Sequence, residues 1–248
     1  MIEYTITNPS FFINSIDSIS SIVDEGVIEF DNYIKLKGMD GGRLVFFELL
    51  IGEDSLLIKK KGYEEVPLFI CDLIKILKRF KGKMETITLL YDNNVLTIRG
   101  KINNKDKTFK LRAIDIDYEG KDLSIEKLLS LPLDAIFKTK RSDILDAIED
   151  CEIYGEWFDI ETKGTLINIY ADGPIGEALN TIELTTEIYS NQKANYSIKF
   201  AKPILKSLYN EDVIIMFRKD YPMAIHDRIS EKSKMVWFIA PRVENEDD

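Results

Sequence analysis

The second half of the chain repeats the first at a shift of 128 residues. The tripeptide Ile-Leu-Lys at residues 76–78 returns at residues 204–206. The same shift aligns further pairs along the chain: Ile16 with Ile144, Phe30 with Phe158, Ile87 with Ile215, Leu89 with Phe217, and Asp92 with Asp220. A period this long is far outside the range of short solenoid repeats, which is about 20 to 50 residues. The repeat therefore predicts one fold used twice.

Composition bounds the class of protein. A chain of 248 residues with 45% hydrophobic and 31% charged residues is an ordinary globular mixture, large enough for two cores. No apolar run approaches the roughly 18 residues that a membrane span needs, and the first residues lack a signal-peptide pattern, so we expect a cytoplasmic chain without a membrane partner. The two cysteines, Cys71 and Cys151, lack metal-site spacing and are expected to be buried.

The net charge of -10 argues against a simple nucleic-acid binder, because such proteins are usually basic. The charge is unevenly spread, however. Acidic residues gather in residues 115–122, 143–152 and 244–248, whereas Lys and Arg cluster elsewhere. The uneven distribution of charge is therefore more informative about function than the net charge is.

Apolar periodicity predicts the same plan in each half. Helices are expected over residues 10–23, 69–80, 142–154 and 201–209, each with one apolar side. Short strands and hairpins fill the intervals, with breaks at Gly38 and residues 40–42 and hairpin turns at residues 92–94 and 220–222. The pattern loosens at residues 116–132. We therefore predict an α+β chain with a domain at residues 1–115, a linker at 116–132, and a second domain with an acidic tail at 133–248.

Several motifs lie in an order and at a spacing that resemble a known family. Residues 237–243 read Trp-Phe-Ile-Ala-Pro-Arg-Val and precede acidic residues, as at the end of sliding DNA clamps of the proliferating-cell nuclear antigen (PCNA) family. Further matching segments are Gly-Met-Asp at 38–40, Lys-Ile-Leu-Lys at 75–78, Leu-Arg-Ala-Ile-Asp at 111–115, and Pro222. The resemblance covers the whole chain, and the residue usage of the sequence is closer to archaeal than to animal members of the family.

The resemblance implies two pseudo-repeated clamp domains, with antiparallel sheets outside and helices lining the hole of a three-subunit ring around duplex DNA. It implies a processivity factor for DNA replication and repair that has no catalytic activity, cofactor or metal. The implied partners are DNA polymerase, flap endonuclease, ligase, a clamp loader, and two further clamp subunits that are either identical or sibling chains.

The resemblance places DNA against the charged side of the second helix in each half. Read alone, these charges would be an ordinary solvated helix face. Contacts to phosphates would be independent of sequence and sensitive to salt. The DNA-facing residues expected from the family are Lys75, Lys78, Arg79, Lys81, Lys199, Lys202 and Lys206.

The first helix of each half departs from the family pattern. Residues 10–23 contain no Lys or Arg, and residues 142–154 carry acids where many family members have arginine. The acids in question are Asp143, Asp146, Glu149 and Asp150. Such carboxylates would repel DNA. Either the duplex leans toward the lysine-bearing helices, or neighbouring subunits of different sequence supply the missing charge.

The resemblance also implies an outer pocket for a partner's Gln-x-x-aliphatic-x-x-aromatic-aromatic peptide. Apolar anchors and backbone pairing would supply the affinity. The alternative is that these residues are ordinary core. The expected pocket residues are Met39, Leu44, Leu123, Ile125, Leu128, Pro222, Trp237, Phe238, Ile239, Ala240 and Pro241.

Two expected strands carry opposite charge, and in the family they join neighbouring subunits head to tail. The basic residues are Lys107, Lys110 and Arg112, and the acidic ones are Glu177, Glu183 and Glu187. The alternative is a pair of internal strands with solvated charges.

Two other functions stay open. One is a specialised or damage-response ring subunit with its own set of partners. The other is a metal-dependent nuclease or transferase built around Asp40, Asp115 and Asp117, although this motif is a weak metal signal.

Overall fold

The computed structural model describes residues 1–80, 85–115 and 125–242, which divide into two compact units. The first unit takes the N-terminal half and, in addition, Arg228–Met235. The second takes the rest of the C-terminal half. The grouping of Arg228–Met235 differs from the domain boundary expected from the sequence. Arg228–Met235 groups with the first unit because Ser233 Oγ donates a hydrogen bond to Asp54 (2.9 Å) and accepts one from the backbone N–H of Gly52 (3.1 Å).

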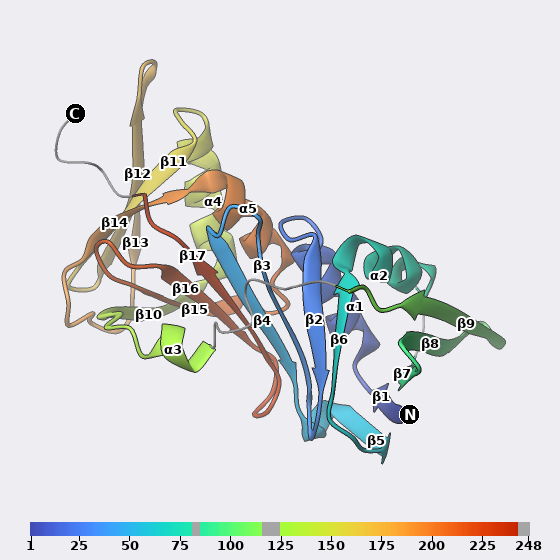
Figure 1. Cartoon of the computed structure of the whole chain (residues 1–248). Coiled ribbons are helices and arrows are strands. Elements are labelled where there is room, and N and C mark those ends of the chain that lie inside the picture. Colours follow the sequence, from blue (N-terminus) through green and yellow to red (C-terminus); the bar gives the residue numbers. More distant parts are fainter. Residues whose placement is uncertain (81–84, 116–124, 243–248) are drawn as a thin grey trace. The chain divides into compact units, whose positions relative to one another are not determined.

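The first unit contains two antiparallel sheets and two helices that lie side by side (Figure 1). One sheet has the order β5-β1-β7-β8-β9, and the other has the order β4-β3-β2-β6. The helices are α1 (Pro9–Ile19) and α2 (Ile70–Leu77), the latter followed by the 3-10 turn η2 (Lys78–Phe80). The strands are β1 (Ile2–Ile6), β2 (Glu25–Phe30), β3 (Ile34–Met39), β4 (Val45–Ile51), β5 (Leu56–Lys60), β6 (Glu64–Phe69), β7 (Ile87–Asp92), β8 (Val95–Ile102) and β9 (Lys105–Arg112), with the short turn η1 (Glu53–Ser55) before β5.

The second unit repeats this plan with one strand fewer among the described residues. Its sheets have the orders β10-β15-β16-β17 and β13-β12-β11-β14, and its long helices are α4 (Arg141–Glu152) and α5 (Ile198–Ser207). The strands are β10 (Ala135–Lys140), β11 (Trp157–Lys163), β12 (Leu166–Gly173), β13 (Gly176–Glu183), β14 (Lys193–Ser197), β15 (Asp212–Phe217), β16 (Met223–Arg228) and β17 (Lys234–Ile239). A short helix, α3 (Ile125–Leu129), lies in the segment expected to be a linker.

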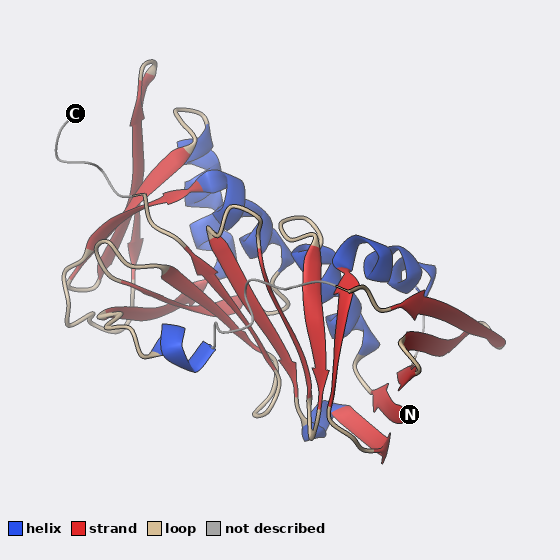
Figure 2. Ribbon diagram, viewed as in Figure 1, coloured by secondary structure: helices blue, strands red, loops and turns tan. Residues whose placement is uncertain are grey.

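Each helix forms because its apolar positions match a buried face. In α2 these positions are Ile70, Leu73, Ile74 and Leu77, all 5% exposed or less. Helix α1 begins where Asn8 accepts a hydrogen bond from the N–H of Phe11 (3.2 Å), with Pro9 in its first turn. Within each unit the helices cover the strands from one side (Figure 2). The α+β fold predicted from the sequence is confirmed by this arrangement.

The structure corrects two details of the sequence analysis. The strand expected to break at Gly38 does not break, because β3 runs through it. Glycine is required there for packing, since a β-carbon at position 38 would stand 2.6 Å from the ring of Phe47. The helix expected over residues 10–23 ends at Ile19.

A further correction concerns the register of the repeat in the first helix of each half. The buried set Phe12, Ser15, Ile16 and Ile19 of α1 recurs in α4 as Ile144, Ala147, Ile148 and Cys151, a shift of 132 residues. The N–H of Ile70 bonds to the carbonyl of Asp24, and that of Ile198 bonds to the carbonyl of Glu156. The shift is thus 132 residues at the second strand and 128 at the second helix. Ile16 therefore matches Ile148, and Phe30 matches Thr162. The predicted matches with Ile144 and Phe158 are wrong.

The described part of the chain has no helix long and apolar enough to cross a membrane.

Candidate functional site

In the first unit, the charged side of α2 and η2 is tied to carboxylates. Lys75 Nζ lies 2.9 Å from a carboxylate oxygen of Asp72 on the same helix. Lys78 Nζ lies 2.6 Å from Asp17, which belongs to α1. Arg79 is exposed, and its backbone carbonyl accepts a hydrogen bond from Lys107 Nζ (2.6 Å). Lys81 lies outside the described residues. The lysines predicted to face DNA are solvent-exposed, but two of them are already paired.

In the second unit, the lysines of α5 are paired with the acids of α4. Lys206 Nζ lies 2.7 Å from Glu149, and Lys202 Nζ lies 3.2 Å from the same carboxylate. Lys202 also contacts Glu152. Lys199 Nζ lies over the ring of Phe200, 5.5 Å from its centre. Glu149 therefore holds two of the lysines predicted to contact DNA.

The pKa values of these groups follow from the pairing. Hydrogen bonds from Lys206 and then Lys202 lower the pKa of Glu149. The hydrogen bond to Glu152 raises the pKa of Lys202, and the hydrogen bond to Asp72 raises that of Lys75. Each of these shifts favours the charged form of Glu149, Lys202 or Lys75.

The predicted site residues do not include the carboxylates that pair with these lysines. From the sequence, Glu149 is expected only to repel DNA, and Asp17, Asp72 and Glu152 are not among the predicted site residues. Asp72 and Lys75 are three apart on one helix, a spacing from which an ion pair can be predicted. The partners of Lys78 and Lys206 are 61 and 57 residues away in sequence, so only the packing of the helices reveals them.

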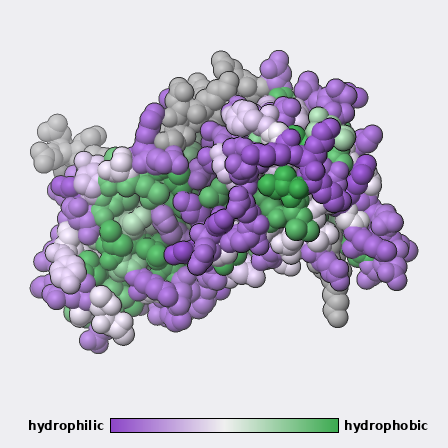
Figure 3. Space-filling view, turned by 90° about the horizontal axis from the view of Figure 1, so that it is seen from below, coloured by the Kyte–Doolittle hydropathy of each residue, from purple (hydrophilic) through white to green (hydrophobic). Residues whose placement is uncertain are grey.

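The pocket residues predicted by resemblance differ in what they can present to a partner. Trp237, Phe238 and Ile239 are at most 2% exposed, as is Ile125, so they support a surface from beneath. Leu44 is 45% exposed. Met39, Leu128, Pro222, Ala240 and Pro241 are half-buried. Leu123 lies outside the described residues. Figure 3 shows that apolar side chains gather in areas of the face that it views.

The two strands predicted to join subunits are both edge strands. β9 ends the sheet β5-β1-β7-β8-β9, and β13 ends the sheet β13-β12-β11-β14. Lys110 and Arg112 are exposed on β9, and Glu177 and Glu183 are exposed on β13. Lys107 is half-buried on β9, whereas Glu187 is exposed and follows β13 in the chain. The edges of both sheets are thus open and carry opposite charge.

Of the residues proposed for a metal-dependent enzyme, Asp40 shapes a turn and Asp115 is exposed. The carboxylate of Asp40 accepts hydrogen bonds from the N–H groups of Gly42 (3.1 Å), Leu44 (2.7 Å) and Val45 (2.6 Å), and so shapes the turn between β3 and β4. Asp117 is outside the described residues. Within residues 1–80, 85–115 and 125–242, no three His, Cys, Asp or Glu side chains come together as a metal site.

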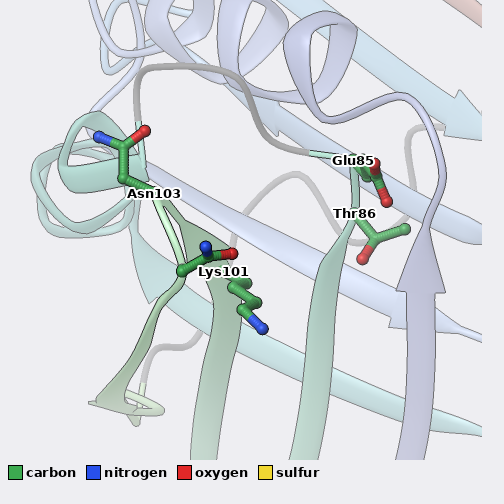
Figure 4. A pocket seen from close by; sticks show the side chains of 5 residues that line it. Glu85, Thr86, Lys101 and Asn103 are labelled. Atoms are coloured by element: carbon green, nitrogen blue, oxygen red, sulfur yellow. The ribbon is translucent and has the colours of Figure 1, made fainter.

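An open hollow of about 540 Å³ lies beside the turn between β8 and β9 (Figure 4). It is lined by Glu85, Thr86, Lys101, Asn103 and Asn104. These are polar groups of mixed charge, and none of the residues predicted to be functional lines it.

Comparison with known proteins gives a consistent result along the full length. No model of a known protein family matches the chain. A DNA polymerase sliding clamp of Methanobrevibacter smithii is 26% identical over 262 residues, with all of both chains covered. A DNA polymerase sliding clamp of Thermococcus fumicolans is 28% identical over 244 residues, with 94% of this chain and 95% of that one covered.

Solved structures match the fold. The chain superimposes on a PCNA of Thermococcus kodakaraensis with a TM-score of 0.87, covering 98% of this chain and 100% of that one at 19% identity. Along its full length, the chain is therefore similar to sliding clamps of the PCNA family. The Proliferating Cellular Nuclear Antigen of Entamoeba histolytica gives a TM-score of 0.85 at 19% identity. The clamp fold predicted by resemblance is therefore confirmed.

Proposed function

We propose that this chain is a subunit of a sliding clamp, a DNA polymerase processivity factor that encircles duplex DNA. The observation that carries the proposal is the full-length similarity to proteins named DNA polymerase sliding clamps, together with the clamp fold. The protein acts in the cytoplasm. Its closed ring stays on DNA because it encircles the duplex, and it carries out no chemical reaction. Its clients are DNA polymerase and repair enzymes such as flap endonuclease and ligase, and a loader opens the ring.

The ring forms when β9 of one subunit pairs with β13 of the next. Both strands are sheet edges with unused backbone hydrogen-bonding groups, and Lys110 and Arg112 on one complement Glu177 and Glu183 on the other. A contact between two different surfaces generates a closed ring when the rotation per subunit is right. Three subunits follow the family pattern.

Identical subunits suit this pairing, because one chain provides both the basic and the acidic edge. The acidic residues of α4 are the reason to expect a ring of different chains, because they would repel DNA. That reason is weaker now that Glu149 and Glu152 are seen to neutralise lysines of their own subunit. A native mass of three copies for the isolated chain would support the identical ring. A monomer or dimer that forms a ring only with a sibling clamp chain would support a specialised subunit.

The DNA-facing surface consists of α2 and α5 with their lysines. The partner surface takes the exposed or half-buried members of the predicted pocket, with Leu44 and Leu128 as its apolar contacts. Both assignments rest on the family resemblance and on the exposure of the side chains.

Primer extension on singly primed circular DNA tests the function. With a compatible loader and polymerase, the chain should lengthen the products made per binding event. On a linear template with free ends the gain should fall, because a topologically held ring slides off. Equal stimulation on circular and linear templates, or none on either, would contradict the proposal.

A further inference from the structure

The same ion pair occurs in both halves of the molecule at equivalent positions. Lys78 and Lys206 are related by the shift of 128 residues that relates α2 to α5. Asp17 and Glu149 are related by the shift of 132 residues that relates α1 to α4. Each carboxylate follows a buried isoleucine, Ile16 or Ile148, and contacts the lysine of the neighbouring helix at 2.6 or 2.7 Å. Two occurrences at matched positions make this a feature of the fold and not of one surface.

The charges of the two helix pairs balance. Helices α1 and α2 with η2 carry two acids and three bases, and helices α4 and α5 carry five acids and four bases. Seven charges of each sign therefore sum to zero over the described helices that would face DNA. The acids are Asp17, Asp72, Asp143, Asp146, Glu149, Asp150 and Glu152, and the bases are Lys75, Lys78, Arg79, Arg141, Lys199, Lys202 and Lys206.

Both pairs are accessible to a competing anion. The side chains of Lys78 and Asp17 are 47% and 35% exposed, and those of Lys206 and Glu149 are 51% and 40% exposed. Ion pairs at this exposure are weak and screened by salt. A phosphate can therefore displace the carboxylate, but it gains less than it would from an unpaired lysine, because the existing pair must first be broken.

We propose that Asp17 and Glu149 are positioning residues that lower the affinity of the clamp for DNA by competing with phosphate for Lys78, Lys202 and Lys206. The inference rests on the proposed function, in which α2 and α5 face the duplex. The carboxylates do not contact DNA. They hold the lysine ammonium groups against α1 and α4, so that each phosphate contact is made in exchange for another ionic contact. Exchanging a carboxylate contact for a phosphate contact keeps each contact with DNA weak. The clamp can then move along the duplex without being stopped by any one contact.

Equilibrium binding to a mixed-sequence duplex, measured by fluorescence anisotropy over a series of salt concentrations, tests the proposal. Replacing Glu149 by Gln keeps the shape and removes the charge, so Lys202 and Lys206 become available. Binding at low salt should tighten several-fold. The slope of log K against log salt should steepen by about 1 to 2, because each additional phosphate contact adds about 0.9. Asp17→Asn should steepen it by about 1.

Asp146→Asn is the matched control. It makes the same change of charge on the same helix, at an exposed side chain for which the described structure shows no ion pair. If Asp146→Asn and Glu149→Gln tighten binding equally, the effect is one of net charge and the proposal is overturned. Glu149→Asp keeps the charge and should stay close to the unaltered chain.

A double variant separates competition from a structural effect. In Glu149→Gln combined with Lys206→Ala, most of the gain in affinity and slope should disappear, whereas a general change in the helices would leave it. Thermal unfolding of each variant checks that α4 is intact, and Asp17→Asn provides an independent test in the other half.

The two proposals can fail separately. If Lys78→Ala and Lys206→Ala leave DNA affinity unchanged, α2 and α5 do not face DNA, and both the DNA surface and this inference are overturned. If these lysine variants weaken binding but neither Glu149→Gln nor Asp17→Asn strengthens it, the DNA surface stands and the inference alone is overturned.

Discussion

The backbone carbonyl of Tyr154 lies against Gly173, in the space that a β-carbon at position 173 would occupy. Tyr154 follows the end of α4, and Gly173 is the last residue of β12. The ring of Tyr154 also lies close to Gly176, the first residue of β13. The hairpin that carries the acidic edge strand is therefore seated directly on the end of α4.

Gly173→Ala should displace this hairpin, because the added methyl group meets rigid backbone and not a flexible side chain. We expect a loss of about 1 to 3 kcal/mol in the free energy of unfolding, the usual cost of overpacking. Self-association should weaken as well, since β13 would shift. Denaturant unfolding and sedimentation measure the two effects. Gly155→Ala is the control, because a β-carbon there meets no atom closer than 4.0 Å. Equal stability of both variants would contradict the expectation.

Reversing charge on one edge strand should weaken assembly. Lys110→Glu places a negative charge where β9 is expected to meet Glu183 or Glu177 of a neighbour, and like charges opposite each other destabilise strand pairs. Sedimentation at micromolar concentration should show fewer assembled chains. Glu183→Lys should do the same. The double variant should recover part of the assembly, and a double variant no better than either single change would argue against pairing of these edges.

The partner surface can be tested at residues that solvent reaches. Leu44→Ala and Leu128→Ala should each weaken binding of a Gln-x-x-aliphatic-x-x-aromatic-aromatic peptide, by about 1 to 3 kcal/mol if they are anchor contacts. Calorimetry measures the affinity. Leu57, which is 56% exposed and outside the predicted pocket, supplies the control Leu57→Ala. Ile125 is unsuitable because it is only 2% exposed, so its truncation would change the fold.

Asp227 is 1% exposed and joins β16 to the loop after α5. Its carboxylate accepts hydrogen bonds from the backbone N–H groups of Tyr209 and Asn210 and from Asn210 Nδ2. Asp227→Ala should lower the free energy of unfolding by about 1 to 3 kcal/mol, because three part-buried hydrogen bonds lose their acceptor. Chemical denaturation measures this change.

The same residue gives a pH dependence with a definite sign. Burial raises the pKa of Asp227, although its hydrogen bonds oppose the shift. The folded state then binds a proton more readily than the unfolded state does, so the contribution of Asp227 to stability increases as the pH falls from above its raised pKa toward the unfolded value. Asp227→Asn should remove this contribution. A pH profile of unfolding that is the same for both proteins would exclude it.

Local pattern was sufficient to predict some elements. The helix α2 follows from the spacing of Ile70, Leu73, Ile74 and Leu77, and the hairpin of β7 and β8 follows from its Asn-rich turn. The predicted break at Gly38 is wrong, because a lone glycine in a strand pattern does not reveal that an aromatic ring will cover it.

The candidate site was predicted only in part for the same kind of reason. The resemblance located the lysines of α2 and α5, but their carboxylate partners lie on other helices. The four-residue change of register between the first and second helices also hid the equivalence of Asp17 and Glu149 in the linear sequence. Contacts between segments distant in sequence are set by packing, which no short window of residues contains.

Because the pair of carboxylate and lysine is present once in each half, the molecule holds two separately adjustable copies of the same restraint. Losing one carboxylate leaves the ion pair of the other half unchanged, so the affinity for DNA can change in steps. An assembly of several identical chains multiplies the number of such steps. Because the affinity for DNA depends on many similar ion pairs, the change of any single pair alters it only slightly.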